Sequence, residues 1–206
     1  MHTLVIDTAT ENCSVALFDN GAPACGECRS LGRGHAEYLI PMISRLPGRG
    51  KAQLIAVSLG PGSFTGVRIG IAAARALALA WGAEVVGYPT LGLVAAMARA
   101  EIGPQPVSVV MTGGHGEWFL QDYAADGSAA GTLASLKPED AATRAKASVA
   151  AGSQAEALVT LRGHGQALSI LPDARQFPLL KKTALVANAA PLYGRPPDAR
   201  LPEQAR

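Results

Sequence analysis

The chain has 206 residues, 49% of them hydrophobic and 17% charged, which is enough length and apolar content to bury a large core and excludes a disordered chain. Its 18 Lys and Arg against 16 Asp and Glu leave a net charge of +2, too little for the basic field of a stand-alone nucleic-acid-binding protein. The start of the chain lacks the basic residues of a secretion signal, and Arg68 and Arg75 interrupt the most apolar stretch, 67–83. These features predict a cytoplasmic protein without a membrane span.

The chain begins with three predicted strands. Two apolar runs, at 3–8 and 13–18, are followed by a third segment at 22–30. The dipeptide Asn20-Gly21 between the last two is typical of a tight hairpin turn. We therefore expect three strands in hairpin succession.

Strands and helices then alternate. Apolar residues recur at helical spacing over 35–46 and predict a helix that bends at Pro41. The remaining predicted elements of this half are a buried strand at 54–59, an Ala-rich helix from 64 to 81, a strand at 84–87 and a helix from Thr90, its N-cap, to Arg99. This order is typical of an α/β fold in which helices are layered on a sheet.

A short proline-containing break, Pro104 to Pro106, divides the chain into two predicted lobes, 1–104 and 105–206. The second lobe opens with two runs, 107–112 and 118–123, that pair as a hairpin and repeat the start of the first lobe in reduced form. The pattern suggests a degenerate duplication.

The rest of the second half carries a weaker pattern. Residues 124–151 are rich in small residues, and no element is assigned to them. A last helix is predicted over 183–193, packing back on the first lobe. The tail 194–206, with three prolines, is predicted to be frayed or draped on the surface.

The turn Asp7-Thr8-Ala9-Thr10 stands where a carboxylate can meet a metal-bound phosphate at the carboxyl edge of a sheet. Nucleotide-binding folds of the actin and sugar-kinase type place a glycine between the Asp and the Thr of this turn, so that the backbone can approach the phosphate. Ala9 does not restore that glycine. Phosphate binding is therefore the weaker interpretation, and capping of the turn by Asp7 and Thr10 the stronger one.

The segment Gly60-Pro61-Gly62-Ser63-Phe64-Thr65-Gly66 is the most specific one in the sequence. It lacks the Gly-Lys-Ser/Thr of a P-loop and the G-x-S-x-G spacing of a nucleophile elbow. Ser63 or Thr65 can cap the following helix, whose free N–H groups could also receive an anion. A structural turn is favoured, and an anion contact remains the alternative.

The histidines and cysteines predict no catalytic or metal site. His35, His115 and His164 lie far apart, without zinc-type spacing. Cys25 and Cys28 form a C-x-x-C, but no helical pattern follows it and Cys13 alone supplies no second ligand pair. Structural thiols are favoured, with a redox dithiol as the alternative hypothesis.

The helix over 64–81 presents an unusual surface. Arg68, Ala72, Arg75 and Leu79 follow one narrow stripe, next to a core-facing row that begins at Val67. Small side chains on this helix let another helix approach closely, and the two arginines can donate to carboxylates. The alternatives are a partner-binding face and a solvated Ala-rich helix.

Four segments together resemble the TsaB (YeaZ) family of tRNA threonylcarbamoyladenosine biosynthesis proteins: IDTATENCSVALFDNG, LGRGHAEYLIPMI, VSLGPGSFTGVRIGIAAARALALA and GAEVVGYPTLGLVA. The match covers nearly all of 3–97 and thins beyond Pro104, where Gly116 and Glu117 and a C-terminal Pro-x-Tyr-x-Arg at 191–195 are kept. The resemblance implies an α/β, two-lobed actin-like ATPase (ASKHA) fold with a reduced second lobe.

The resemblance also implies a function without catalysis by this chain. It implies a scaffold or activator subunit of the complex that makes N6-threonylcarbamoyladenosine at position 37 of tRNA, paired with the catalytic paralogue TsaD and joined by the ATPase TsaE. It implies a homodimer when the chain is alone, contact with tRNA only through the complex, and no catalytic or metal residues. No cofactor is expected on the isolated chain, and ATP or ADP would bind only at an interface in the complex.

The expected partner contacts lie on the first two helices. They are Tyr38, Met42, Arg45, Arg68, Ala72, Arg75 and Leu79. The rival hypothesis is an active small-molecule kinase or ATPase of the actin-like superfamily, which the turn with Ala9 argues against.

Overall fold

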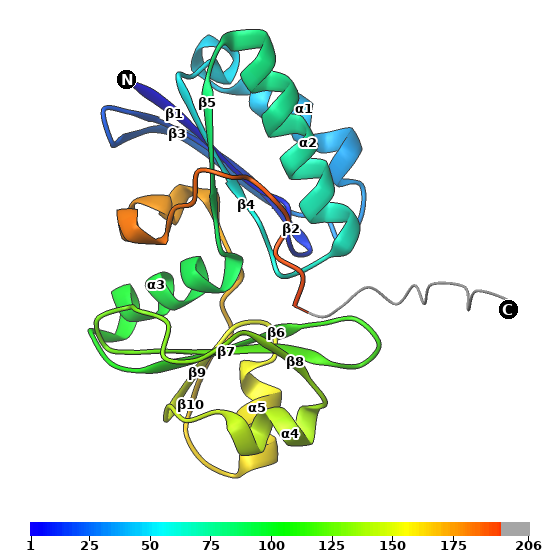
Figure 1. Cartoon of the computed structure of the whole chain (residues 1–206), viewed down its shortest axis with the longest axis vertical. Helices are drawn as coiled ribbons and strands as arrows, with labels where there is room; N and C mark the ends of the chain where they lie inside the picture. Colours follow the sequence, from blue (N-terminus) through cyan, green and yellow to red (C-terminus); the bar gives the residue numbers. More distant parts are fainter. Residues whose placement is uncertain (195–206) are drawn as a thin grey trace, which may run out of the picture.

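The computed structural model describes residues 1–194 and has two lobes, each built on a five-stranded sheet (Figure 1). The tail predicted to drape on the surface lies, from 195 on, outside the described residues.

The first sheet has the strand order β3-β2-β1-β4-β5. The strands β1 (His2–Asp7), β2 (Asn12–Asp19) and β3 (Ala22–Ser30) are antiparallel, which confirms the predicted hairpins. Asn20 and Gly21 both have positive φ, the backbone of a tight hairpin turn that glycine adopts without strain. The strands β4 (Leu54–Ser58) and β5 (Glu84–Tyr88) run parallel to β1, and both were expected.

Two helices, α1 (His35–Arg45) and α2 (Phe64–Trp81), cover one face of this sheet (Figure 1). Side chains alternate along β1, so Leu4 and Ile6 face the helices while Val5 faces the opposite side. A short 3-10 segment, η1 (Pro47–Gly50), leads from α1 toward β4. By length and composition α2 is apolar enough to cross a membrane, but here it packs as a core helix of the first lobe.

The helix α3 (Thr90–Ile102) lies between the two sheets. Leu91 and Val94 join the core under the second sheet, whereas Leu93 packs against the first. The helix α3, which ends just before the predicted break at Pro104, therefore contributes to both cores. Thr90 is the first residue of α3 rather than its cap, and its hydroxyl bonds to that of Ser58 (2.6 Å).

The second sheet has the order β10-β9-β6-β7-β8. The predicted hairpin of β6 (Val107–Thr112) and β7 (Trp118–Tyr123) is confirmed. The sequence did not predict the remaining elements of this lobe: β8 (Ala134–Leu136), α4 (Pro138–Arg144), β9 (Val149–Ala151), α5 (Ala155–Arg162) and β10 (Gln166–Leu168). The strands β6 to β10 repeat the order and pairing directions of β1 to β5, as the duplication hypothesis predicts.

The predicted helix over 183–193 is wrong. Two 3-10 turns, η2 (Ala174–Leu179) and η3 (Lys182–Ala184), are followed by irregular chain to 194. Pro191 cannot donate a helical hydrogen bond, and the chain instead bonds to the first sheet through Val186, Leu192 and their partners. The segment 183–193 does pack back on the first lobe, where Leu185 joins the hydrophobic cluster that contains Tyr88.

Candidate functional site

Asp7, at the end of β1, lies inside the first lobe with 1% of its surface exposed. Its carboxylate accepts hydrogen bonds from the Ala9 N–H (3.0 Å) and from the Tyr88 hydroxyl (3.1 Å). Burial raises the pKa of this carboxyl to about 6, although the two donors act in the opposite direction. Asp7 is thus bonded within its own lobe, which favours the capping interpretation of the turn.

Glycines let α2 lie directly on that turn. A Cβ at Gly62 would overlap the carbonyl oxygen of Ala9, and one at Gly66 would overlap that of Thr8. At Gly70 a Cβ would meet the hydroxyl of Thr8. The glycine spacing of this motif is therefore explained by the close approach of a helix to a neighbouring turn.

Ser63 caps α2, one of the two caps that the sequence offered. Its hydroxyl accepts from the Gly66 N–H (3.1 Å), and its own N–H donates to the Ala9 carbonyl (2.7 Å). The Thr8 hydroxyl donates to the Gly66 carbonyl (2.7 Å). These bonds support the structural-turn interpretation, and an anion contact stays a prediction.

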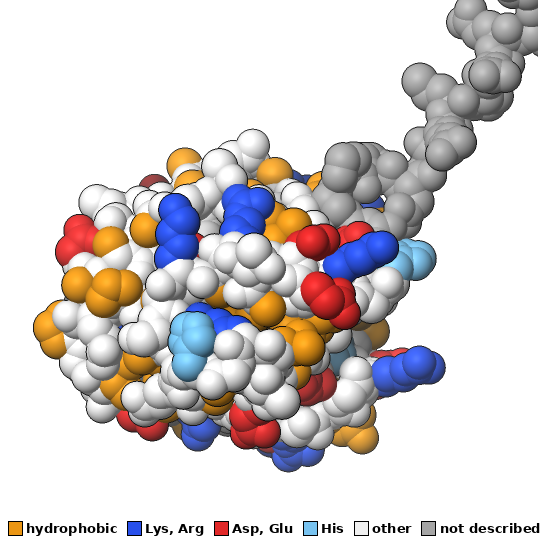
Figure 2. Space-filling model, turned by 90° about the horizontal axis from the view of Figure 1, so that it is seen from below, with side chains coloured by type: hydrophobic (Ala, Val, Ile, Leu, Met, Phe, Trp, Pro, Cys, Tyr) orange, Lys and Arg blue, Asp and Glu red, His pale blue; other side chains and the backbone are white. Residues whose placement is uncertain are grey.

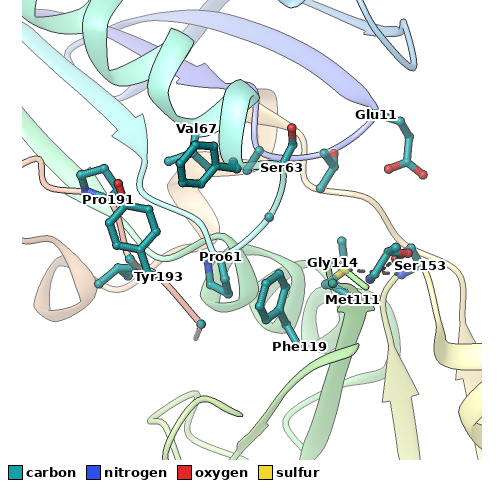
Figure 3. Close-up of a pocket in the computed structure, with 18 of the residues that line it drawn as sticks. Glu11, Pro61, Ser63, Val67, Met111, Gly114, Phe119, Ser153, Pro191 and Tyr193 are labelled. Carbon is teal, nitrogen blue, oxygen red and sulfur yellow. Dashed lines mark hydrogen bonds between the residues drawn. The ribbon is translucent and has the colours of Figure 1, made fainter. Parts of the chain in front are cut away.

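A cleft of about 820 Å³ lies between the lobes (Figure 3). Its upper wall comes from the start of α2, its lower wall from the β6–β7 hairpin, and one side from the C-terminal segment. Apolar side chains dominate the walls: Pro61, Phe64, Val67, Met111, Phe119, Pro191 and Leu192. Asp7 is not among the lining residues.

Polar groups occupy the margins of this cleft. The hydroxyls of Thr112 and Ser153 bond to each other (3.1 Å), and Gln154 donates to Thr112 (2.8 Å). Glu11 and Arg68 also line the cleft. Within residues 1–194, no group of three or more His, Cys, Asp or Glu side chains could hold a metal ion. The side chains that line the cleft thus offer mainly apolar contact.

The predicted partner residues separate into exposed and buried ones. Tyr38, Ala72 and Leu79 are exposed, Leu79 by 89%. Arg45 is exposed too, and its guanidinium forms a two-point ion pair with Glu27 of β3 (2.9 and 3.2 Å). These four side chains are accessible on α1 and α2, the helices on which the partner-binding face is predicted.

Met42 is wrong as a member of that face. It is fully buried between α1 and the first sheet. It is buried together with Leu39 and Ile43, two of the apolar residues whose helical spacing predicts this helix.

The two arginines of α2 bond to their own chain. Arg75 donates to the Ala189 carbonyl (2.8 Å), and Arg68 donates to the Tyr193 hydroxyl (2.9 Å). The Arg68 guanidinium also lies over the Phe64 ring, 3.4 Å from its centroid. These contacts were not predicted, because the sequence pattern favoured a helix over 183–193. Pro191 was the available signal that this segment is not helical.

The redox-dithiol hypothesis is not supported. Cys25 and Cys28 both lie in β3, three residues apart, so they point to opposite faces and their Cα atoms are about 10 Å apart. A disulfide needs Cα atoms within about 7 Å. Burial raises the pKa of Cys28 to about 11, which further removes it from thiolate chemistry.

Known proteins share this fold along almost the whole chain. A family model described as "TsaD: tRNA N6-adenosine threonylcarbamoyltransferase" matches residues 29–178. The tRNA threonylcarbamoyladenosine biosynthesis protein TsaB of Escherichia coli (strain K12) is 34% identical over 221 residues, with 95% of each chain covered. The chain belongs to the TsaB (YeaZ) family. This family name connects it with tRNA threonylcarbamoyladenosine biosynthesis and confirms the resemblance found in the sequence.

Solved structures agree with this TsaB assignment. YeaZ from Pseudomonas aeruginosa has a TM-score of 0.80 at 30% identity, covering 93% of this chain and 99% of its own. The ethanolamine utilization protein EutJ from Carboxydothermus hydrogenoformans has a TM-score of 0.50 at 13% identity, over 88% of this chain and 90% of its own, and shares the fold alone. The predicted two-lobed, actin-like ATPase fold is confirmed.

Proposed function

We propose that this chain is a non-catalytic scaffold subunit that binds and activates a TsaD-like threonylcarbamoyltransferase acting on adenosine 37 of tRNA in the cytoplasm. The observation that carries the proposal is the exposed face of α1 and α2, on which Leu79 stands 89% exposed beside small residues. An apolar side chain so exposed on a smooth helix is typical of a surface that another helix covers.

The geometry of α2 suits helix packing. Ala72, Ala76 and Ala80 are exposed and follow one another at four-residue spacing, leaving a shallow groove along the helix. Ridges of a second helix fit such grooves, and small residues bring the two axes close. Tyr38 adds an exposed aromatic side chain on the neighbouring helix α1, and Tyr is enriched at interfaces.

The first turn of the lobe supports the absence of catalysis. In this proposal Asp7 has lost any role with a metal-bound phosphate, because its carboxylate is bonded to Ala9 and Tyr88 inside the lobe. Ala9, where phosphate-binding turns of this type have glycine, is itself buried. The isolated chain is then expected to turn over no ATP, and a nucleotide would bind only at an interface formed with a partner.

The other partners follow from the same face. A free chain with this surface exposed is expected to pair with a second copy through α1 and α2, and the TsaD-like subunit to replace that copy. A TsaE-like ATPase joins the resulting assembly. The tRNA is reached through the catalytic subunit, consistent with a net charge of only +2 on this chain.

The test pairs two exposed leucines. Leu79→Glu on α2 is expected to weaken binding to a TsaD-like subunit at least tenfold in calorimetric titration, because it places a charge in the centre of an apolar contact. Leu161→Glu, on α5 of the other lobe and 50% exposed, is the matched control and should leave affinity unchanged. Equal affinities for both variants would rule out the α2 face.

A tRNA modification assay tests the activity itself. The catalytic subunit should form threonylcarbamoyladenosine faster with this chain present, and Leu79→Glu should remove that gain. Multiple-turnover ATP hydrolysis by the purified chain alone would instead support the rival hypothesis of an active kinase or ATPase.

A further inference from the structure

The last described residues, 186–194, run along the first lobe to the cleft; we call them the C-terminal strap. Two points anchor the strap. Val186 and Gly87 exchange a pair of backbone hydrogen bonds (2.9 and 2.8 Å), and the Leu192 N–H donates to the Leu59 carbonyl (2.7 Å). Between these anchors only Ala189 is buried. The strap is thus attached at its ends and largely exposed between them.

The strap occupies both arginines of α2. The Ala189 carbonyl accepts a hydrogen bond from Arg75, and the Tyr193 hydroxyl accepts one from Arg68. Both acceptors are uncharged, and no ion pair involves either arginine within residues 1–194. A guanidinium binds a carboxylate about twice as strongly as a neutral acceptor, and in a two-point geometry. The strap therefore accepts one hydrogen bond from each guanidinium and supplies no negative charge to either.

The helix α2 itself carries charge of one sign only. The helix α2 has no acidic residue from Phe64 to Trp81, and its only charged side chains are Arg68 and Arg75. Seven residues separate them, which is two helical turns or about 10 Å along the axis. A complementary surface would carry two carboxylates at that separation.

The strap also reaches the cleft. Leu192 and Tyr193 line it, and the Tyr193 ring lies 6.1 Å from that of Phe64 at the start of α2 (Figure 3). At Gly194 the chain lies against Phe119 of β7, so closely that a Cβ would overlap its ring. The same nine residues therefore contact the arginine side of α2 and both walls of the cleft.

We propose, on the basis of the proposed function, that the C-terminal strap is an intramolecular stand-in for an acidic partner surface. A partner with two carboxylates about 10 Å apart takes Arg68 and Arg75 from Tyr193 and Ala189 as it docks on α2. The strap then leaves α2 and withdraws Leu192 and Tyr193 from the cleft. Docking of the partner on α2 and opening of the cleft are therefore coupled in a single step.

Amide hydrogen exchange of the free chain tests the strap without any partner. The amides of Val186 and Leu192 should exchange through local opening, well before the amides of β1 and β4. Tyr193→Phe removes only the bond to Arg68 and should speed their exchange about threefold to tenfold. Tyr123→Phe, which removes a hydroxyl bonded to Gln121 in the second lobe, is the matched control. It should not change the exchange rates of the strap amides. Strap amides that exchange only together with the β1 amides would overturn the proposal.

The complex with a TsaD-like subunit gives the second measurement. Strap amides should lose protection on binding, and Tyr193→Phe should tighten binding by a factor similar to its effect on exchange. A complex in which the strap stays protected would overturn the strap proposal and leave the proposed function standing. Failure of any complex to form would overturn the proposed function, while the free-chain exchange still decides whether the strap opens.

Discussion

The two lobes have the same strand order and different surfaces. In the first, the outer strand β3 has nine residues and α1 and α2 have 11 and 18; in the second, β8 has three and α4 and α5 have seven and eight. Both sets of helices cover their sheet, so each lobe has a complete core. Only the longer helices extend enough smooth surface to receive another helix. A duplicated topology thus conserves the core while the exposed faces diverge.

The charge on those faces differs as well. On the end of the molecule formed by the second lobe, Lys and Arg side chains lie scattered among Asp and Glu (Figure 2). A surface on which both signs of charge are interspersed is well solvated. The outward side of α2, by contrast, carries alanines, an exposed leucine and two arginines. The proposed partner-binding surface thus lies on the first lobe, where this side of α2 is exposed.

The largest expected effect tests whether the cores are equivalent. Met42→Ala in α1 and Leu158→Ala in α5 each remove a fully buried side chain. Each should lower the free energy of unfolding by about 4 kcal/mol, within the range for cavity-forming substitutions. Urea unfolding measures both. A much smaller loss of unfolding free energy for Met42→Ala would mean that Met42 is not buried and would restore it to the predicted partner-binding face.

The next effect contrasts the first turns of the two lobes. Gly66→Ala places a Cβ on the carbonyl of Thr8 and should cost about 3 kcal/mol, because backbone must move. Gly114→Ala, in the turn after β6, meets nothing within 4 Å and should be nearly neutral in the same unfolding experiment. Equal losses of unfolding free energy for the two variants would mean that α2 does not pack directly on the turn after β1.

A third effect depends on pH. The end of β1 carries the buried Asp7, whereas the corresponding end of β6 carries the exposed Thr112. Since the pKa of Asp7 is raised from 3.8 to about 6, the folded chain keeps a proton that the unfolded chain releases between those values. The free energy of unfolding should therefore fall by about 2 to 3 kcal/mol as the pH rises from about 4 to about 6.

Asp7→Asn should flatten that pH dependence. The amide keeps an acceptor for the Ala9 N–H and can donate to the Tyr88 hydroxyl, which then donates to the Ile6 carbonyl (3.1 Å). Asp140→Asn on the exposed side of α4 should leave the slope unchanged. A slope that survives Asp7→Asn would assign the titration to another group.

How far the sequence predicts this molecule depends on the strength of the local pattern. Apolar runs, the Asn20-Gly21 turn and helical spacing predicted every strand and α-helix of the first lobe, though not the short 3-10 segment η1. The strands β8, β9 and β10 have three residues each and lie in stretches of small residues, too short for alternation to register. The helix predicted over 183–193 failed because its apolar residues bind β5 and the cleft, contacts with residues about a hundred positions away.

The candidate site was predicted in part for the same reason. Helical spacing located Ala72 and Leu79 on the exposed side of α2, since periodicity reports which face is buried. It could not show that Arg68 and Arg75 are engaged by Tyr193 and Ala189, because those partners are more than a hundred residues away in sequence. Contacts between a helix and a distant irregular segment produce no periodic pattern in the sequence of either segment.

The smallest effect concerns the thiols of β3, the strand whose counterpart in the second lobe has three residues. Cys25 and Cys28 point to opposite faces of that strand, and Cys13 on β2 is fully buried. Mild oxidation of the folded chain should therefore form no internal disulfide and change the free energy of unfolding by less than about 0.5 kcal/mol, the usual limit for a surface change. Mass spectrometry after alkylation in urea should count three thiols, with Cys25 labelled first in the native chain because it is exposed. A Cys25–Cys28 disulfide would require β3 to leave the sheet edge, and so would contradict the pairing of β3 with β2 on which the first lobe is built.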